Sequence, residues 1–328
     1  MRPLLLLTIL ACTPAAAGAS DAPPVRQAEI GLFLVEITDI DELAGTFTAE
    51  FDVVSRWQDP ARAWPVPADA PDRRTFVDED ALAELHRGWW PALHAVNGVG
   101  GYERGILRVT VRSDGTVTNR ARLRMTLRAP LDFRAFPFDR QELPVHVESV
   151  LEPAGRLGLA AAADFAGFAE DFAMPEWRLV GMSSGRTVVE RRQEGQPYAR
   201  VSFRIGVERL SGYYLWKIML PMAIIVMISW VVFWMSDEGL GRRAGVSSTG
   251  MLTVIAYQFV VAGSLPRFPY LTTMDRISLT ALLFIAATML INLLGSRRDP
   301  AGRLRLDRVC RLAFPVAFAA VVAVDLAR

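Results

Sequence analysis

Cysteine and lysine are nearly absent from this sequence of 328 residues, which contains two cysteines and a single lysine, Lys217. Cys12 falls in an expected leader and Cys310 beside an apolar segment, so an exported domain has to be stable without an intrachain disulfide. A surplus of positive charge is lacking as well, because 36 Lys and Arg residues are matched by 35 Asp and Glu residues. This balance argues against nucleic acid as a partner.

Several signatures of enzymes and metal sites are also missing. The sequence has no HExxH motif and no Walker-type phosphate loop, and its three histidines show no pairing with a nucleophile. His146 and Glu148 share one face of an expected strand, but two potential ligands are too few for a metal site. The sequence therefore predicts a protein that is not an enzyme, with no catalytic residues, no cofactor and no metal.

The first two thirds of the chain are expected to leave the cytoplasm and fold as β structure. Residues 1–19 combine an early arginine, an apolar run and small residues, which predicts a secretory signal peptide. Residues 20–210 contain no run long enough to span a bilayer, only short apolar runs separated by turn signals, which predicts a β-sandwich domain. Within it, Asp78 to His86 is expected to be a helix, and Leu159 to Phe168 an irregular connection.

Residues 211–328 are predicted to form a membrane domain. Four apolar stretches, at about 214–235, 246–265, 277–294 and 312–326, approach the length of a spanning helix, and the fourth is interrupted by Pro315 and Asp325. Arginines are concentrated between the first and second stretches and between the third and fourth. The positive-inside rule then places both loops in the cytoplasm. We expect a multi-pass protein of the inner (plasma) membrane whose N-terminal domain is extracellular or periplasmic.

The second stretch differs from the others because small and hydroxyl residues replace leucine. Small residues can serve close helix packing, but a stripe of this kind can also line a pore, with bulky apolar residues that gate it by dewetting. At helical spacing the stripe consists of Gly245, Thr249, Leu252, Ala256, Phe259 and Gly263.

Phe136-Pro137-Phe138-Asp139, placed ahead of four apolar stretches, resembles the signature loop of the pentameric ligand-gated ion channels, the Cys-loop receptor superfamily. Ala129 and Leu143 stand where animal members have the bracketing cysteines, as in prokaryotic members. One bacterial member, which responds to small primary amines, is similar in five ordered segments: 132–141, 213–216, 251–259, 265–270 and 310–315. The resemblance implies an all-β immunoglobulin-like sandwich followed by a four-helix transmembrane bundle, assembled as a pentamer. The implied partners are identical subunits in a homopentamer, a small-molecule agonist, permeating inorganic ions and the lipid bilayer.

Carried over position by position, the resemblance also implies residue roles. Glu148 and Tyr198 would hold an amine, whereas Arg120 could recruit a carboxylate, so an amine and an amino acid both remain open as agonists. The expected ligand-binding residues are His94, Glu148, Val150 and Tyr198 on one face, with Asp52 and Arg120 on the opposing face. The expected residues that couple the two domains are Asp139, Arg209, Phe136, Pro137, Pro266 and Pro269, with Asp41 or Glu42 nearby.

Ion selectivity is expected to depend on the cytoplasmic end of the second stretch. The resemblance places Arg242 where cation-selective members commonly have an acid, and Arg243 follows it directly; a basic ring favours anions. Asp237 and Glu238 lie a few residues earlier and offer the opposite charge. The sequence therefore leaves two alternatives: an anion-preferring channel, or a cation-selective channel gated by an amine or by pH.

A non-conducting membrane sensor is the competing function from another class. Its sandwich would bind a ligand and signal without a pore. The short cytoplasmic loops argue against it, because they leave little chain to contact an effector.

Overall fold

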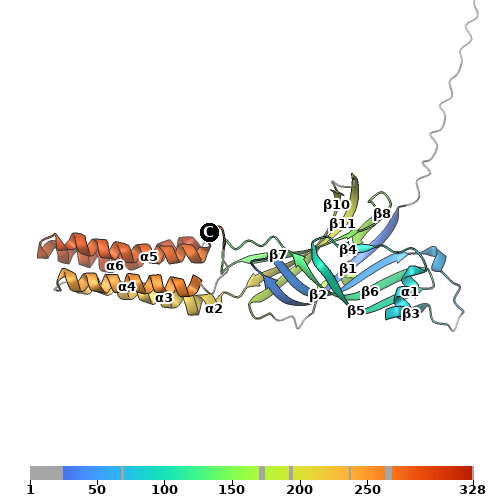
Figure 1. The fold of residues 1–328 in the computed structure, drawn as a ribbon, viewed down its shortest axis with the longest axis horizontal. Coiled ribbons are helices and arrows are strands. Elements are labelled where there is room, and N and C mark those ends of the chain that lie inside the picture. Colours follow the sequence, from blue (N-terminus) through green and yellow to red (C-terminus); the bar gives the residue numbers. More distant parts are fainter. Residues whose placement is uncertain are drawn as a thin grey trace, which may run out of the picture.

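A computed structural model describes residues 25–67, 70–169, 174–191, 195–235, 238–262 and 268–326. Figure 1 shows an elongated molecule with a β-sandwich at one end and a bundle of long helices at the other. The expected signal peptide, residues 1–19, lies outside the described residues.

The sandwich consists of a seven-stranded and a four-stranded sheet. The larger sheet has the order β3-β5-β6-β2-β1-β8, with β9 paired to β1, and the smaller sheet the order β10-β11-β7-β4. The larger sheet contains β1 (Arg26–Asp41), β2 (Thr46–Gln58), β3 (Arg73–Val77), β5 (Gly98–Arg112), β6 (Thr116–Arg128), β8 (Leu157–Ala161) and β9 (Gly167–Phe168); the smaller contains β4 (Leu93–Ala95), β7 (Arg140–Ser149), β10 (Trp177–Arg191) and β11 (Gln196–Arg209).

Alternating side chains explain why the two sheets pack face to face. Along β6, apolar residues such as Val117 and Leu127 are buried, while intervening positions carry arginines. Phe51 of the larger sheet and Phe203 of the smaller sheet are fully buried in the common core. Between β5 and β6, Gly115 takes a φ of +84°, and an added Cβ would lie 2.6 Å from the Asp59 carbonyl oxygen, so the turn requires glycine.

The expected helix at Asp78 to His86 is confirmed as α1. The expectation of an irregular connection at Leu159 to Phe168 is wrong in part. This segment contributes to β8 and then, after a short 3-10 turn, to β9, and both pair in parallel with β1. Gly31 of β1 allows this close approach, because an added Cβ there would lie 2.3 Å from the Phe165 Cβ.

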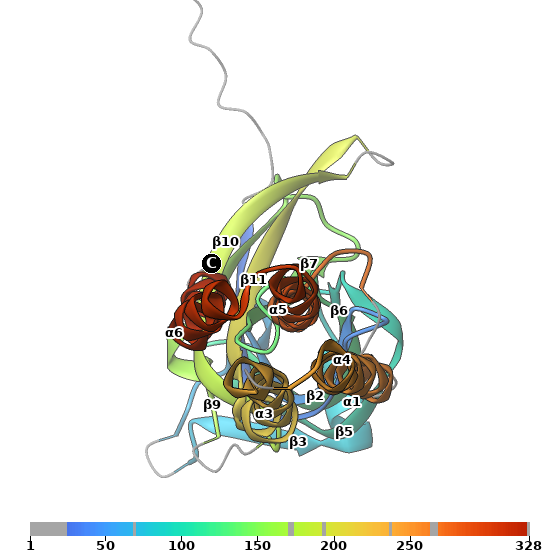
Figure 2. The same ribbon diagram turned by 90° about the vertical axis from the view of Figure 1, so that its left-hand side faces the viewer.

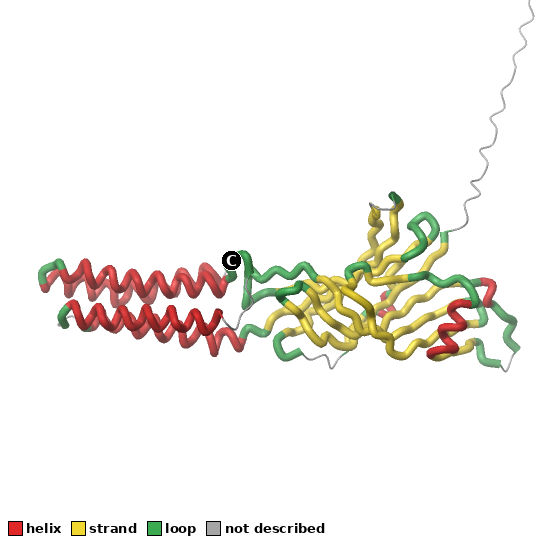
Figure 3. Tube along the Cα trace, viewed as in Figure 1, coloured by secondary structure: helices red, strands yellow, loops and turns green. Residues whose placement is uncertain are grey.

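Helices follow directly on β11. The first runs through α2 (Gly212–Tyr214), a π-helical turn (Leu215–Met219), α3 (Leu220–Trp230) and a final 3-10 turn (Val231–Trp234). The π turn precedes Pro221, whose ring nitrogen cannot donate a hydrogen bond. This first helix is followed by α4 (Leu240–Ala262), α5 (Thr273–Ser296) and α6 (Pro300–Leu326). Figure 3 shows these helices aligned along the long axis of the molecule.

Three helical segments are long and apolar enough to cross a membrane: Gly212–Trp234, Thr273–Ser296 and Pro300–Leu326. The last begins twelve residues before the expected Leu312, because its arginine-rich first turns are helical as well. The second expected stretch forms the 23-residue helix α4, but α4 is not among these three apolar segments. Its polar composition therefore sets α4 apart from its neighbours.

The helices, viewed end-on in Figure 2, pack around a shared apolar core. Val226 of α3, Val254 of α4 and Ile285 of α5 are fully buried there. Around Trp230, the rings of Phe284, Phe314 and Phe318 pack in tilted or edge-on contacts that tie α5 and α6 to α3. Because α4 joins this core along one side only, its other side is left exposed in the single chain.

Candidate functional site: the domain junction and the exposed face of α4

Arg209, the last residue of β11, is buried at the junction between sandwich and helices. Its Nε donates a hydrogen bond to Asp139 Oδ1 at 2.8 Å, and its Nη2 donates one to Glu42 Oε1 at 2.5 Å. Gln141 Nε2 donates to the other oxygen of Asp139 at 2.7 Å. The structure thus brings Asp139 and Arg209 together as the sequence predicts, and it selects Glu42 rather than Asp41 as the third member.

Aromatic rings enclose the same guanidinium. The Arg209 Cζ atom lies 4.2 Å from the ring centroid of Trp177 and 4.8 Å from that of Phe136. Such contacts add cation–π attraction where water is excluded. Trp177 is a member of this cluster that the sequence analysis missed, because it lies on β10, 32 positions before Arg209.

The loop that carries the signature motif is bound directly to the start of α5. The Phe133 amide donates to Tyr270 Oη at 3.1 Å, and the Phe136 carbonyl accepts from the Met274 amide at 3.1 Å. The rings of Phe133 and Phe268 stack with centroids 4.7 Å apart. Pro137 follows a cis peptide bond in this loop, and Pro269 is exposed between the aromatic residues 268 and 270. Pro266 lies outside the described residues.

Burial raises the pKa of Glu42 above its ordinary value of 4.5, and the neighbouring carboxylates of Asp139 and Glu176 act in the same direction. The Arg209 charge and hydrogen bond lower it but do not offset the burial. Glu42 is therefore the carboxylate of this cluster that takes up a proton at a higher pH than an ordinary glutamate.

The residues expected on the first face of the agonist site lie on the four-stranded sheet. His94 of β4 is opposite Glu148 of β7, and Tyr198 is on the adjacent β11. Glu148, expected to hold an amine, does not offer a free carboxylate in the single chain. Its side chain is buried and paired with Arg191 at 2.9 Å and Arg200 at 2.5 Å.

Arg191 also occupies the aromatic surface expected for the agonist. Its Cζ atom lies 4.0 Å from the centroid of the buried Tyr198 ring. His94 of β4 is exposed, as is Val150, the residue that follows β7. In the single chain, this face therefore presents arginine where an amine would need a carboxylate.

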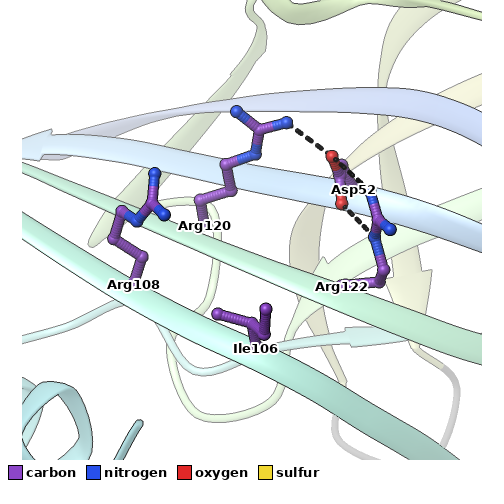
Figure 4. Close-up of a pocket in the computed structure, with 5 residues that line it drawn as sticks. All are labelled: Asp52, Ile106, Arg108, Arg120 and Arg122. Carbon is purple, nitrogen blue, oxygen red and sulfur yellow. Dashed lines mark hydrogen bonds and ion pairs between the residues drawn. The ribbon is translucent and has the colours of Figure 1, made fainter. Parts of the chain in front are cut away.

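The opposing residues line a separate depression of about 250 Å³ on the seven-stranded sheet, drawn in Figure 4. Asp52 is bound by Arg120 at 2.5 Å and by Arg122 at 2.9 Å. Burial acts to raise the pKa of Asp52, but hydrogen bonds from the two arginines outweigh it and keep the pKa below its usual value. Arg108 lines the depression as well and, among the described residues, has no carboxylate within ion-pair distance.

The predicted pore stripe lies on the exposed side of α4. Leu252 and Phe259 are 68% and 76% exposed, although both are large and apolar. On the opposite side, Ser247 and Val254 are fully buried. The exposed members are Gly245, Thr249, Leu252, Ala256 and Phe259; Gly263 lies outside the described residues.

The two arginines at the start of α4 lie on different faces of the helix. Arg242 continues the exposed stripe and pairs with Glu238 at 2.7 Å. The expectation that Arg243 lies at the pore mouth differs from the structure: its side chain is 3% exposed and pairs with Asp307 of α6 at 2.7 Å. Asp237 lies outside the described residues.

The partners that the sequence analysis missed are mostly arginines. Arg122 had a usable signal, since it follows Arg120 by two positions and therefore shares its face of β6. Arg191 and Arg200 had no such signal, because they reach Glu148 only through strand pairing over more than 40 residues.

The family of neurotransmitter-gated ion-channel ligand-binding domains matches residues 19–211, more than half of the chain. The chain belongs to this family. It is accordingly a ligand-gated ion-channel protein of the membrane, with its ligand-binding domain outside the cell interior.

Three curated relatives cover different shares of the chain. A proton-gated ion channel of Gloeobacter violaceus is 25% identical over 307 residues, covering 91% of this chain and 83% of its own length. A γ-aminobutyric acid receptor subunit beta-like protein of Drosophila melanogaster is 29% identical over 56% of this chain and 36% of its own. A γ-aminobutyric acid receptor subunit beta of Caenorhabditis elegans is 26% identical over 79% and 47%.

Replacing Asp139 with Asn is expected to impair gating more than surface expression. The change keeps the shape but removes the charge facing Arg209, leaving a buried cation with a weaker partner, a loss of about 3–5 kcal/mol when the whole pair is broken. Agonist-evoked current normalised to surface protein measures the effect, with the exposed Asp132→Asn as control. An Asp139→Asn response equal to that of the native protein would contradict a coupling role.

Glu42→Gln is expected to remove an acid-sensitive component of gating at pH values above 4.5, because the pKa of Glu42 is raised. Because the pKa of Glu42 is raised in the folded chain, its contribution to stability is present at low pH and is lost as the pH rises through that pKa. Acid therefore weakens the pairing with Arg209 without unfolding the protein through this group. Current recorded against extracellular pH, with the exposed Glu142→Gln as control, tests this; an identical pH profile in Glu42→Gln would refute it.

Proposed function

We propose that this chain forms a homopentameric ligand-gated ion channel in which α4 lines the pore. The observation that carries the proposal is the exposed stripe from Gly245 to Phe259 on a helix that otherwise packs against α3 and α5. A stripe of glycine, threonine and alanine gains little from lipid, whereas five copies facing one another enclose water. The match to the ligand-gated channel family supports this arrangement.

The proposed pore requires α4 to span the membrane in addition to the three apolar segments named above. Its 23 residues extend about 34 Å at 1.5 Å per residue, enough to cross the hydrocarbon core. Its lower hydropathy is the expected property of a helix with one side in water. The domain boundary then falls near residue 210, between the end of β11 and the first helix.

We assign the closed constriction to Leu252 and Phe259, the bulky apolar members of the stripe. Rings of exposed apolar side chains can expel water from a narrow pore. The junction around Arg209 would transmit movement of the sandwich to these rings, because its loop binds the start of α5, which packs on α4.

The proposed agonist is a small molecule with a carboxylate, such as an amino acid, and not a simple amine. The two acids among the expected ligand-binding residues are already paired with arginines, Glu148 with two and Asp52 with two. Arg108, in the same depression as Asp52, keeps its charge available. Charge-assisted hydrogen bonds from arginine suit a carboxylate.

The proposed selectivity is a weak anion preference. Arg242 is the basic residue that faces the proposed lumen, and Glu238 compensates its charge in part. The N-termini of five α4 helices add partial positive charge at the same mouth. The non-conducting sensor remains the alternative, and the absence of current under every condition would favour it.

Leu252→Ser is expected to make the channel conduct without agonist, because a hydroxyl hydrates the constriction. Purified protein in a planar bilayer under a potassium chloride gradient measures this current and its reversal potential. Reversal toward the chloride potential is expected. Reversal at the potassium potential would contradict the anion preference, and silence of Leu252→Ser would contradict the pore assignment. Leu283→Ser, an exposed leucine on α5, is the matched control and should stay closed.

Arg108→Gln is expected to raise the half-activating concentration of a carboxylate agonist by about tenfold or more, the effect of losing a hydrogen bond to a charged group. The probes are glycine, γ-aminobutyrate and propylamine, the last of which has no carboxylate. Arg112→Gln, an exposed arginine on the same strand, is the control. Activation by propylamine with no effect of Arg108→Gln would contradict the carboxylate assignment.

A further inference from the structure

The helix α6 contains only two acids, and both are buried against the bundle. Asp307 and Asp325 are separated by eighteen residues, five helical turns, so they share one face about 27 Å apart. At one end Asp307 pairs with Arg243 of α4, and at the other Asp325 lies 3.4 Å from Arg276 of α5. Among the residues that the structure describes, α6 thus has one carboxylate ion-paired with α4 and a second, Asp325, ion-paired with α5.

Both terminal nitrogens of the Arg243 guanidinium donate hydrogen bonds. Nη1 donates to Asp307 Oδ2 at 2.9 Å, and Nη2 donates to Asp307 Oδ1 at 2.7 Å and to Asn292 Oδ1 at 2.8 Å. The amide of Asn292 in turn donates to Ser247 Oγ at 3.0 Å. A bidentate arginine–carboxylate pair with this support fixes both charge and direction.

Arg242 and Arg243 lie at the same depth of the bundle but about 100° apart around α4. Arg242 is on the exposed stripe, with a side chain 69% exposed, whereas Arg243 is 3% exposed. If α4 lines the pore, only one of two adjacent cations reaches the lumen. The burial of the other depends on an acid that comes from the outer helix α6.

We infer that Asp307 is a positioning residue for ion selectivity: it holds the Arg243 charge out of the lumen and so limits the positive charge at the cytoplasmic mouth. A buried arginine that loses its carboxylate is strongly destabilised. Its long side chain can then turn toward the water at the cytoplasmic mouth of the proposed pore. One added cation per subunit at the mouth favours anions. This inference rests on the proposed function of α4.

The test uses full-length protein in planar bilayers, with Leu252→Ser as the parent so that no agonist is needed. Asp307→Asn is expected to raise the chloride-to-potassium permeability ratio about fivefold, which corresponds to about 1 kcal/mol, the interaction of two unit charges 4 Å apart in water. Arg243→Gln combined with Asp307→Asn should keep the parent ratio, because no charge is released. Asp325→Asn, the matched loss of an acid from α6, should keep it as well.

The outcomes separate this inference from the function on which it rests. A parent that does not conduct contradicts the pore itself. A conducting parent whose ratio is unchanged by Asp307→Asn, or a double variant that shifts as far as the single one, overturns the role of Asp307. An equal shift in Asp325→Asn overturns it too, since loosening of α6 would then suffice.

A charge-swapped variant covers the case in which Asp307→Asn does not assemble. Arg243→Asp with Asp307→Arg restores the ion pair with its polarity reversed. Assembly with the parent ratio supports the inference, because both charges are again held inside the bundle. Failure of the swapped protein to assemble, or a shifted ratio, overturns it.

Discussion

The ion cluster at Arg209 is the interaction on which the rest of the molecule depends. One guanidinium joins the β1–β2 turn through Glu42, the signature loop through Asp139, and β10 through Trp177. The chain enters its first helix within three residues of Arg209. Surface ion pairs contribute about 0–1 kcal/mol, but breaking a buried one costs about 3–5 kcal/mol. A fully buried cation with two carboxylates therefore cannot be displaced without moving the segments around it.

Arginine–carboxylate ion pairs of the same kind occur in both sheets and among the helices. Glu148 is held by two arginines in the smaller sheet, Asp52 by two in the larger sheet, and Asp307 by Arg243 among the helices. Arginine suits these sites because its planar fork can bind both oxygens of a carboxylate and is less strongly hydrated than an ammonium group. The near absence of lysine is consistent with this use, since most of these cations are structural. An arginine such as Arg108, which has no carboxylate partner among the described residues, therefore points to an anionic group on the ligand.

Features that depend on local sequence could be predicted, and those that depend on distant pairing could not. The helix at 78–86, the strand alternation and the helical stripe on α4 follow from periods within a short window. The orientation of Arg243 does not, because its partner lies 64 residues later on another helix. The helix α6 begins before the expected apolar stretch for a related reason. Its first turns are charged, so hydropathy does not reveal that the helix extends beyond the apolar segment. The resemblance supplied the roles of Asp139 and Arg209, but the aromatic enclosure became visible only in three dimensions.

The most direct test of the central claim is a cryo-electron microscopy map of the purified chain in lipid nanodiscs. We expect a five-fold ring with α4 innermost, the Gly245 to Phe259 stripe facing the axis, and density joining Arg243 to Asp307 away from it. A ring with another helix at the axis, or an Arg243 side chain projecting into the lumen, would contradict the account.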